Sequence, residues 1–340
     1  MADGGEGSTI AIVNATGGQF IRKTVQGPLG EEVEATIGIH GDGETAVIEM
    51  ATASGIQLVP PADRNPYYTS TYGTGELIRY CLDEGITSII LCIGGSATND
   101  GGVGMAQALG YQFKDQNGKE IKRGGIYLKD IVSIDSSTVH KDLENCKIRI
   151  ASDVNNPLTG PEGASAVFGP QKGATPEMVQ ELDAALSNLD RVIIIGMRKD
   201  LNKSINDIPG AGGAGGLGGG LLAFTNSTLQ RGVDLIVEAT NLKAKLADAD
   251  YCFTGEGQID FQTKYGKTPY GVLQAAKAVD DEIKVMAVCG SVGAGIEELY
   301  EVGFDGIFGT IASMTDYETI IQDTTLNVAR VTEAVARLIK

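Results

Sequence analysis

The sequence predicts an α/β fold, and three observations carry this prediction. Short apolar runs such as residues 87–93 alternate with stretches that carry apolar residues at helical spacing. Loops rich in glycine and small polar residues follow several of these runs, as they do at strand ends in α/β proteins. Near the N-terminus, residues 19–26, 33–40 and 46–50 are short and β-branched, with GPLG and GDG turns between them. We expect these three segments to form an antiparallel meander.

After residue 71 the pattern becomes a regular alternation of helices and strands. A helix is expected at 75–84, a strand buried on both faces at 87–93, and a helix at 103–109. Residues 232–240 and 241–247 indicate a strand or turn that leads into a helix. Further strands are expected at 148–153, 251–254, 284–289 and 306–310, and further helices from Thr175 and at 270–278, 296–302 and 317–338. This alternation predicts a parallel sheet with right-handed crossovers.

Length, charge and cysteine content limit the class of protein. The 340 residues suit two domains or one large α/β domain, and 42% hydrophobic with 21% charged residues is a globular composition. Lys+Arg 27 against Asp+Glu 44 gives a net charge of −17, which argues against nucleic acid or an anionic membrane as partner. Five scattered cysteines without a CxxC pair indicate buried thiols in a reducing compartment. The chain opens on no signal peptide, so we expect a cytoplasmic protein.

Four loops contain residues that could carry chemistry, at 2–8, 94–102, 152–157 and 254–260. In α/β sheets, ligands bind at the carboxyl ends of strands, where most of these loops are expected. Carboxylates there could hold Mg²⁺, amides and hydroxyls could hold a polar substrate, and Lys264 and Lys267 could meet phosphate charge. The set suits phosphoryl transfer, although each loop alone is also a common turn. Asp153 could be a loop cap or a general base, and the flanking glycines favour a site role for Glu256.

Two apparent nucleotide motifs fail on their context. Residues 210–215 match G-x-G-x-x-G by letter, but no strand precedes them, as a dinucleotide site would require. Residues 266–268 resemble the end of a P-loop, but Phe261 occupies the position of its first glycine. Neither segment therefore identifies a nucleotide site by itself.

Longer motifs point to a family. IGGSATNDGGVGMA at 93–106, SDVNNPL at 152–158, GPEGASAVFGPQKG at 160–173 and FTGEGQID at 253–260 resemble the bacterial type I glycerate kinases. The resemblance covers essentially the whole chain. It implies ATP-dependent phosphorylation of D-glycerate, usually at the 2-hydroxyl. It also implies a Rossmann-like parallel-sheet domain with a second α/β domain inserted into it, and a site in the cleft between them.

Within that resemblance, the inserted domain with the meander would span residues 8–228. Residues 1–7 and 229–340 would form the rest of the Rossmann-like domain. Family members usually carry a further strand, loop, helix and strand before the motif that begins here at Ala2. Without that segment, an apolar sheet surface would be exposed, and we expect poor solubility or self-association into a homo-oligomer, with activity in doubt.

The resemblance gives positions, to which we attach roles as hypotheses. Asp153 or Asp100 would accept the proton of the attacking hydroxyl. The carboxylate and hydroxyls of the substrate would be bound by Ser96, Asn99 and Asn155.

The remaining hypotheses concern ATP and its metal ion. Mg²⁺ would be bound, directly or through water, by Glu256, Asp3 and Glu6. Nucleotide phosphates would face the glycine-rich stretch around Gly212, Gly213 and Gly215, together with Lys267.

Two other functional classes stay open from the sequence. One is another small-hydroxyacid enzyme on the same cleft, such as a dehydrogenase. The other is a non-catalytic remnant that binds glycerate or nucleotide without turnover. Binding of NADH would indicate the first, and ligand binding without ADP release would indicate the second.

Overall fold

The computed structural model describes residues 5–196, 204–311 and 316–339. The chain divides into two compact units, Ala2–Gly232 and Val233–Lys340, which are described separately below. This division does not show whether one unit is inserted into the other, so the insertion of 8–228 into a Rossmann-like domain stays a prediction. Within the described residues, no helix is both long enough and apolar enough to span a bilayer.

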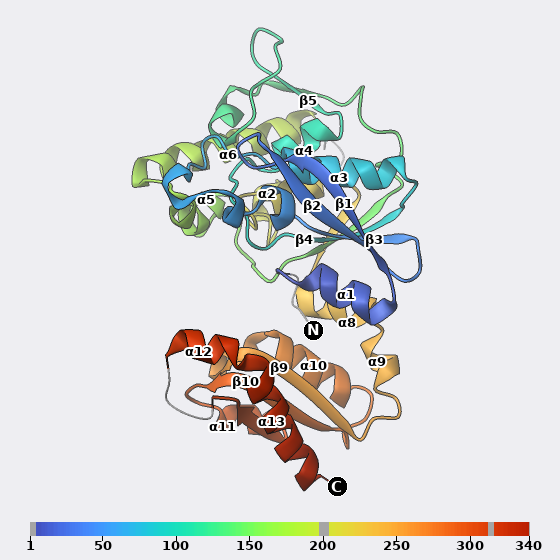
Figure 1. The fold of residues 1–340 in the computed structure, drawn as a ribbon. Helices are drawn as coiled ribbons and strands as arrows, with labels where there is room; N and C mark the ends of the chain where they lie inside the picture. Colours follow the sequence, from blue (N-terminus) through green and yellow to red (C-terminus); the bar gives the residue numbers. More distant parts are fainter. Residues whose placement is uncertain (1–4, 197–203, 312–315, 340) are drawn as a thin grey trace. The chain divides into compact units, whose positions relative to one another are not determined.

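The first unit is built on a six-stranded mixed sheet in the order β1-β2-β3-β4-β7-β8 (Figure 1). Strands β1, β2 and β3 pair antiparallel, whereas β3, β4, β7 and β8 are parallel. The predicted meander and α/β class are thereby confirmed. The strands are β1 Gln19–Gln26, β2 Glu32–Ile39, β3 Thr45–Glu49, β4 Ser88–Cys92, β7 Lys147–Ala151 and β8 Ser227–Gln230, and a separate pair is formed by β5 Gln112–Lys114 and β6 Ser133–Asp135.

Helices cover both faces of this sheet. Ile37 and Ile39 of β2 belong to the main core with Leu77 of helix α3, while Gly38 between them faces Val13 of helix α1. Because side chains alternate across a strand, α1 and α3 lie on opposite faces. The helices of this unit are α1 Ser8–Thr16, α2 Ala51–Ser54, α3 Tyr72–Asp83, α4 Val103–Ala108, α5 Ala164–Phe168, α6 Pro176–Gly196 and α7 Leu217–Phe224, and its 3-10 turns are η1 Ile56–Leu58, η2 Pro61–Asp63, η3 Gly125–Asp130, η4 Pro170–Lys172 and η5 Ile205–Asp207.

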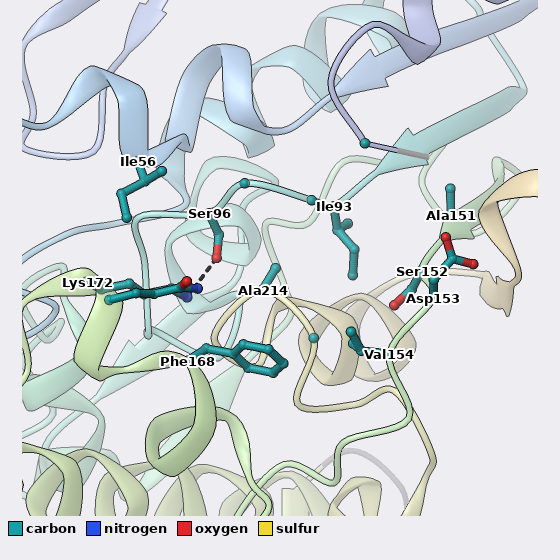
Figure 2. A pocket seen from close by; sticks show the side chains of 15 residues that line it. Ile56, Ile93, Ser96, Ala151, Ser152, Asp153, Val154, Phe168, Lys172 and Ala214 are labelled. Carbon is teal, nitrogen blue, oxygen red and sulfur yellow. Dashed lines mark hydrogen bonds between the residues drawn. The ribbon is translucent and has the colours of Figure 1, made fainter. Parts of the chain in front are cut away.

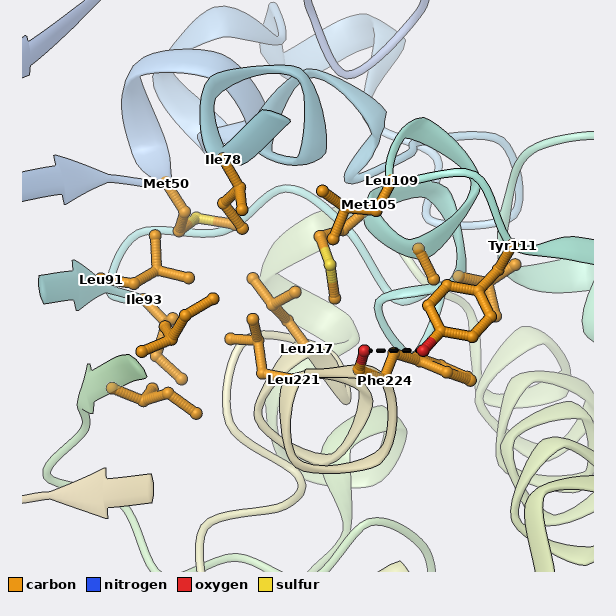
Figure 3. Close-up of a cluster of buried hydrophobic side chains, with 14 of the residues drawn as sticks. Met50, Ile78, Leu91, Ile93, Met105, Leu109, Tyr111, Leu217, Leu221 and Phe224 are labelled. Carbon is orange, nitrogen blue, oxygen red and sulfur yellow. Dashed lines mark hydrogen bonds between the residues drawn. The ribbon is translucent and has the colours of Figure 1, made fainter. Parts of the chain in front are cut away.

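Helix α7 was not expected, because it contains three consecutive glycines, which disfavour helix in isolation. Close packing explains its glycines, since a Cβ on Gly220 would lie 2.2 Å from the carbonyl oxygen of Gly101. Its apolar residues Leu217 and Leu221 point into the main core (Figure 3). There the hydroxyl of Tyr111 donates to the carbonyl of Phe224 at 2.9 Å. Burial against the sheet therefore outweighs the weak helix propensity of the segment.

The second unit has a three-stranded parallel sheet in the order β11-β10-β9. Strand β9 continues to Ile259, so Glu256, which was expected in a loop after the strand, lies inside it and opposite Cys289 of β10. The predicted helix 317–338 is two helices that meet at Asp323, and no proline or glycine marks that break. The elements are α8 Gly232–Ala239, α9 Leu242–Lys245, β9 Tyr251–Ile259, η6 Phe261–Tyr265, α10 Thr268–Lys277, β10 Lys284–Val292, α11 Glu297–Glu301, β11 Gly306–Gly309, α12 Tyr317–Gln322 and α13 Thr324–Leu338.

All five cysteines are free and buried, as predicted. Burial raises the pKa of Cys81 to about 12 and that of Cys146 to about 11. A thiol that is hardly ionised near neutral pH is a poor nucleophile, so these cysteines pack as small apolar side chains.

Candidate functional site

A cavity of about 420 Å³ lies in the first unit, next to the carboxyl ends of strands β4 and β7 (Figure 2). These two strands are parallel neighbours, so the loops that follow them meet at one edge of the sheet. The cavity is lined by Gly5, Ile56, Ile93, Gly94, Gly95, Ser96, Ala151, Ser152, Asp153, Val154, Phe168, Gln171, Lys172, Gly213 and Ala214. Three of the four loops chosen from the sequence, 2–8 through Gly5, 94–102 and 152–157, thus supply part of the cavity lining.

Asp153 places an exposed carboxylate at this cavity, two residues after the end of β7. Its Oδ1 accepts a hydrogen bond of 2.9 Å from the backbone N–H of Gly232. That bond orients the carboxylate of this exposed residue. Asn155, expected beside it as a substrate ligand, is exposed but is not among the lining residues.

Lys172 contributes a buried cation to the same cavity, 2% exposed, and it was not among the expected site residues. Its Nζ donates a 2.7 Å hydrogen bond to Ser96 Oγ (Figure 2). It donates a second one, also of 2.7 Å, to the carbonyl oxygen of Thr98. Burial lowers the pKa of Lys172 to about 7, and the charge of Asp100 opposes this shift. Its context in the GPQKG segment, a lysine between glycines among small and apolar residues, could have singled it out.

Asp100 lies in the protein core and not at the cavity. Its Oδ2 accepts from the backbone N–H and the hydroxyl of Thr71 at 2.8 and 2.9 Å, and from Gly104 N at 3.2 Å. Its Oδ1 accepts from Gly102 N at 3.2 Å. Burial raises the pKa of Asp100, while these hydrogen bonds lower it. The contacts favour a role in holding the 94–102 loop over the expected role as proton acceptor, because the carboxylate faces donors of the protein itself.

Asn99 and two of the three chosen glycines do not line the cavity. Asn99 is fully buried, and its Nδ2 donates to Ser165 Oγ at 3.0 Å. A Cβ on Gly212 would lie 2.1 Å from the carbonyl oxygen of Pro157, and one on Gly215 would lie 1.9 Å from that of Thr98. These two glycines allow backbone segments to approach closely. Gly213 is the member of this group that lines the cavity.

Comparison with known proteins decides the family. The model of the family described as "Glycerate kinase family" matches residues 1–340. The chain belongs to the glycerate kinase family. The resemblance inferred from the four sequence motifs is thereby confirmed.

Individual glycerate kinases are similar over nearly the whole chain. The chain is 46% identical to the glycerate kinase of Bacillus subtilis strain 168 over 340 residues, which cover 100% of this chain and 87% of that one. It is 44% identical to the glycerate 2-kinase of Escherichia coli K12 over 336 residues, 99% of this chain and 87% of that one. A crystal structure of a Salmonella typhimurium LT2 protein assigned as glycerate kinase 2 aligns with a TM-score of 0.89, at 47% identity, over 100% of this chain and 87% of that one.

The residues chosen for metal and nucleotide in this glycerate kinase family member are divided between the two units. Glu6 is exposed in the turn before α1, and Asp3 lies outside the described residues. Glu256 is in strand β9 of the second unit. Lys267, also in the second unit, is the N-cap residue of helix α10, and its Nζ lies 3.7 Å from Asp260 Oδ1. Among the described residues, no group of three or more His, Cys, Asp or Glu side chains could hold a metal ion.

Proposed function

We propose that this protein transfers the γ-phosphoryl group of ATP to D-glycerate, at the 2-hydroxyl. The proposal rests on one observation above all. The motifs shared with glycerate kinases supply a cavity at the carboxyl edge of a parallel sheet, with an exposed carboxylate on its wall. The relatives from B. subtilis and E. coli are named glycerate kinase and glycerate 2-kinase, and the second name favours the 2-position.

Asp153 is our candidate for the proton acceptor, in preference to Asp100. Phosphoryl transfer depends mostly on positioning and charge neutralisation, so the protein must orient one hydroxyl of the acceptor toward the γ-phosphorus. Asp153 Oδ1 is held by Gly232 N, and the side chain reaches the cavity. It can therefore accept a hydrogen bond from the hydroxyl and take its proton as the hydroxyl oxygen bonds to the γ-phosphorus. The bond from that phosphorus to the oxygen of the β-phosphate breaks in the same transfer, and ADP leaves.

We propose that Mg²⁺ arrives with ATP and is not held in a protein cage. Magnesium keeps several waters and is commonly bound by one or two carboxylates together with substrate phosphates. Gly213, whose backbone borders the cavity, and Lys267 remain proposed phosphate contacts. Glu256, Glu6 and Asp3 remain proposed metal contacts, directly or through water. We also propose a reducing, cytoplasmic location, which the five buried thiols support.

An ADP-release assay with D-glycerate and MgATP tests the proposal, with the B. subtilis relative as positive control. Enolase added to the product distinguishes the positions, because it dehydrates 2-phosphoglycerate directly and does not act on 3-phosphoglycerate. We expect D-glycerate-dependent ADP release that EDTA abolishes, and enolase-dependent formation of phosphoenolpyruvate. Calorimetric glycerate binding without ADP release would indicate the non-catalytic alternative. Glycerate-dependent turnover of a nicotinamide cofactor would indicate the dehydrogenase alternative.

A further inference from the structure

One buried lysine, Lys172, lines the cavity, and the phosphoryl transfer proposed above gives it no role. Among the described residues that line it, Lys172 and Asp153 are the charged ones. Lys172 is among the largest fully buried side chains of the described structure. Removing an ammonium from water is costly unless the surroundings compensate it. A lysine buried at a ligand cavity in spite of that cost suggests an anionic ligand group, whose negative charge would favour the protonated form of the lysine.

The hydrogen bonds of Lys172 fix the direction of the Ser96 hydroxyl. An ammonium has donors and no acceptor, so Ser96 Oγ must accept the 2.7 Å bond from the charged form of Lys172. The proton of the Ser96 hydroxyl is then available for another acceptor. No described residue accepts it, and Ser96 lines the cavity. The hydroxyl is thus oriented as a donor, and the adjacent positive charge strengthens it in that role.

The surroundings make this donor effective toward an anion. Ile56, Ile93 and Phe168 supply apolar parts of the same lining, which lower the local dielectric and strengthen charge interactions. The carbonyl oxygen of Thr98, in the loop 94–102, accepts a second 2.7 Å hydrogen bond from the ammonium of Lys172. The cation is therefore held in one place, without a carboxylate in direct hydrogen-bond contact with it among the described residues.

We propose that Lys172 and Ser96 form the carboxylate-binding element of the cavity, in which the ammonium polarises the Ser96 hydroxyl and that hydroxyl donates to the carboxylate of the substrate. This inference rests on the proposed function and adds to it the feature that selects acids over neutral alcohols. Ser96 is the contacting residue, and Lys172 is a positioning residue that acts through it. A substrate with a neutral amide in place of the carboxylate loses the charge interaction while keeping its shape and hydroxyls.

The test compares two acceptors, D-glycerate and its neutral amide D-glyceramide, by their kcat/KM in ATP-dependent phosphorylation. We expect Lys172→Met to lower the ratio of acid to amide by about 10- to 100-fold, the range for a hydrogen bond to a charged group. The loss should fall mainly on KM for D-glycerate. Lys172→Arg, which keeps the charge, should restore part of the ratio. Lys141→Met removes one exposed positive charge outside the cavity and should leave the ratio unchanged.

Ser96→Ala is a second variant that tests the same proposal. It removes one oxygen and buries no new charge. We expect it to lower the same ratio in the same direction, so the proposal stays testable if Lys172→Met fails to fold. If both acceptors lose activity equally in either folded variant, Lys172 and Ser96 serve the fold alone and the inference is overturned. Calorimetric binding of glycerate against glyceramide gives the same comparison without turnover. A chain that prefers the acid in binding but releases no ADP would refute the kinase proposal and retain this inference.

Discussion

The carboxylate of Glu49, the last residue of strand β3, accepts the backbone N–H of Thr9 in the first turn of helix α1 at 2.7 Å. Its second oxygen accepts the N–H of Gly7 at 3.2 Å. Glu49 is 7% exposed and Thr9 is buried, so the amide of Thr9 would be buried without an acceptor if Glu49 were absent, whereas Gly7 is half-buried. A negative charge at a helix N-terminus also interacts favourably with the helix dipole. Because Gly5 lies in the same turn and lines the cavity, Glu49 connects the β3 end to the cavity wall.

We expect Glu49→Ala to lower the free energy of unfolding by about 2–4 kcal/mol, because two backbone donors lose a charged acceptor. Glu49→Gln keeps one acceptor oxygen and should have about half that effect. Urea denaturation followed by circular dichroism measures both. Glu44→Ala, an exposed glutamate in the preceding turn, is the control and should change stability by less than about 0.5 kcal/mol. Equal urea midpoints for Glu49→Ala and Glu44→Ala would contradict this account of α1.

Asp153→Asn should separate catalysis from folding. An amide keeps the size of the side chain and an acceptor oxygen for Gly232 N, but it cannot take a proton. We expect kcat for D-glycerate to fall by about 10²- to 10⁴-fold, with stability nearly unchanged. Steady-state ADP release and urea unfolding provide the two measurements, with the exposed Asp63→Asn as control. Wild-type turnover in Asp153→Asn would remove this residue from the role of proton acceptor.

Asp100→Asn should show the opposite pattern, with a loss of stability. In the wild-type chain, the backbone N–H groups of Thr71, Gly102 and Gly104 donate to the carboxylate of Asp100. In the variant, the amide nitrogen is itself a donor and would face at least one of these N–H groups, which would lose its acceptor. Lys172 would also lose a nearby buried negative charge. We expect a loss of about 3–5 kcal/mol, the usual cost of breaking a buried charge arrangement. A variant as stable as wild type but without turnover would instead support a catalytic role for Asp100.

Gly215→Ala tests the close approach of the Gly215 backbone to the carbonyl oxygen of Thr98. Gly215 has φ +69° and a Cβ there would lie 1.9 Å from the Thr98 carbonyl oxygen, which also accepts from Lys172. Gly118 has nearly the same φ, +72°, and open space around it. Gly118→Ala should therefore cost only about 1 kcal/mol of backbone strain, whereas Gly215→Ala should cost several times more. Thermal unfolding of both variants makes the comparison, and similar midpoints would show that the loop moves freely to accept the methyl group.

The burial of Lys172 predicts a dependence of stability on pH. Its pKa falls from 10.5 to about 7 in the folded chain, so between these values the unfolded chain binds more protons than the folded one. The free energy of unfolding therefore rises with pH through this window. Lys172→Met lacks the group and should lack this contribution. Urea unfolding at pH 7 and pH 9 should thus show a larger gain for wild type than for Lys172→Met. Parallel changes in the two proteins would mean that the lysine keeps its charge when folded.

Much of the fold could be predicted because its signals are local. The apolar run at 87–93 and the turn residues between 19 and 50 predict β4 and the meander within one or two residues. The helix α7 and the extension of β9 through Glu256 could not be predicted in this way, since glycines there disfavour regular structure locally. Their helix and strand are stabilised by neighbours, Gly101 in one case and the paired strand β10 in the other.

The candidate site, like the fold, could be predicted from the sequence only in part. Sequence alone determined the α/β class, the family and the loops at which chemistry is expected, because these depend on motifs and on periodicity along the chain. Only the tertiary structure decided that Asp153 is exposed at the cavity while Asp100 is buried. It also decided that Lys172 reaches Ser96 across 76 residues of sequence. The physical reason is that burial and long-range hydrogen bonds depend on which distant segments pack together, and residue type and local spacing do not encode that directly.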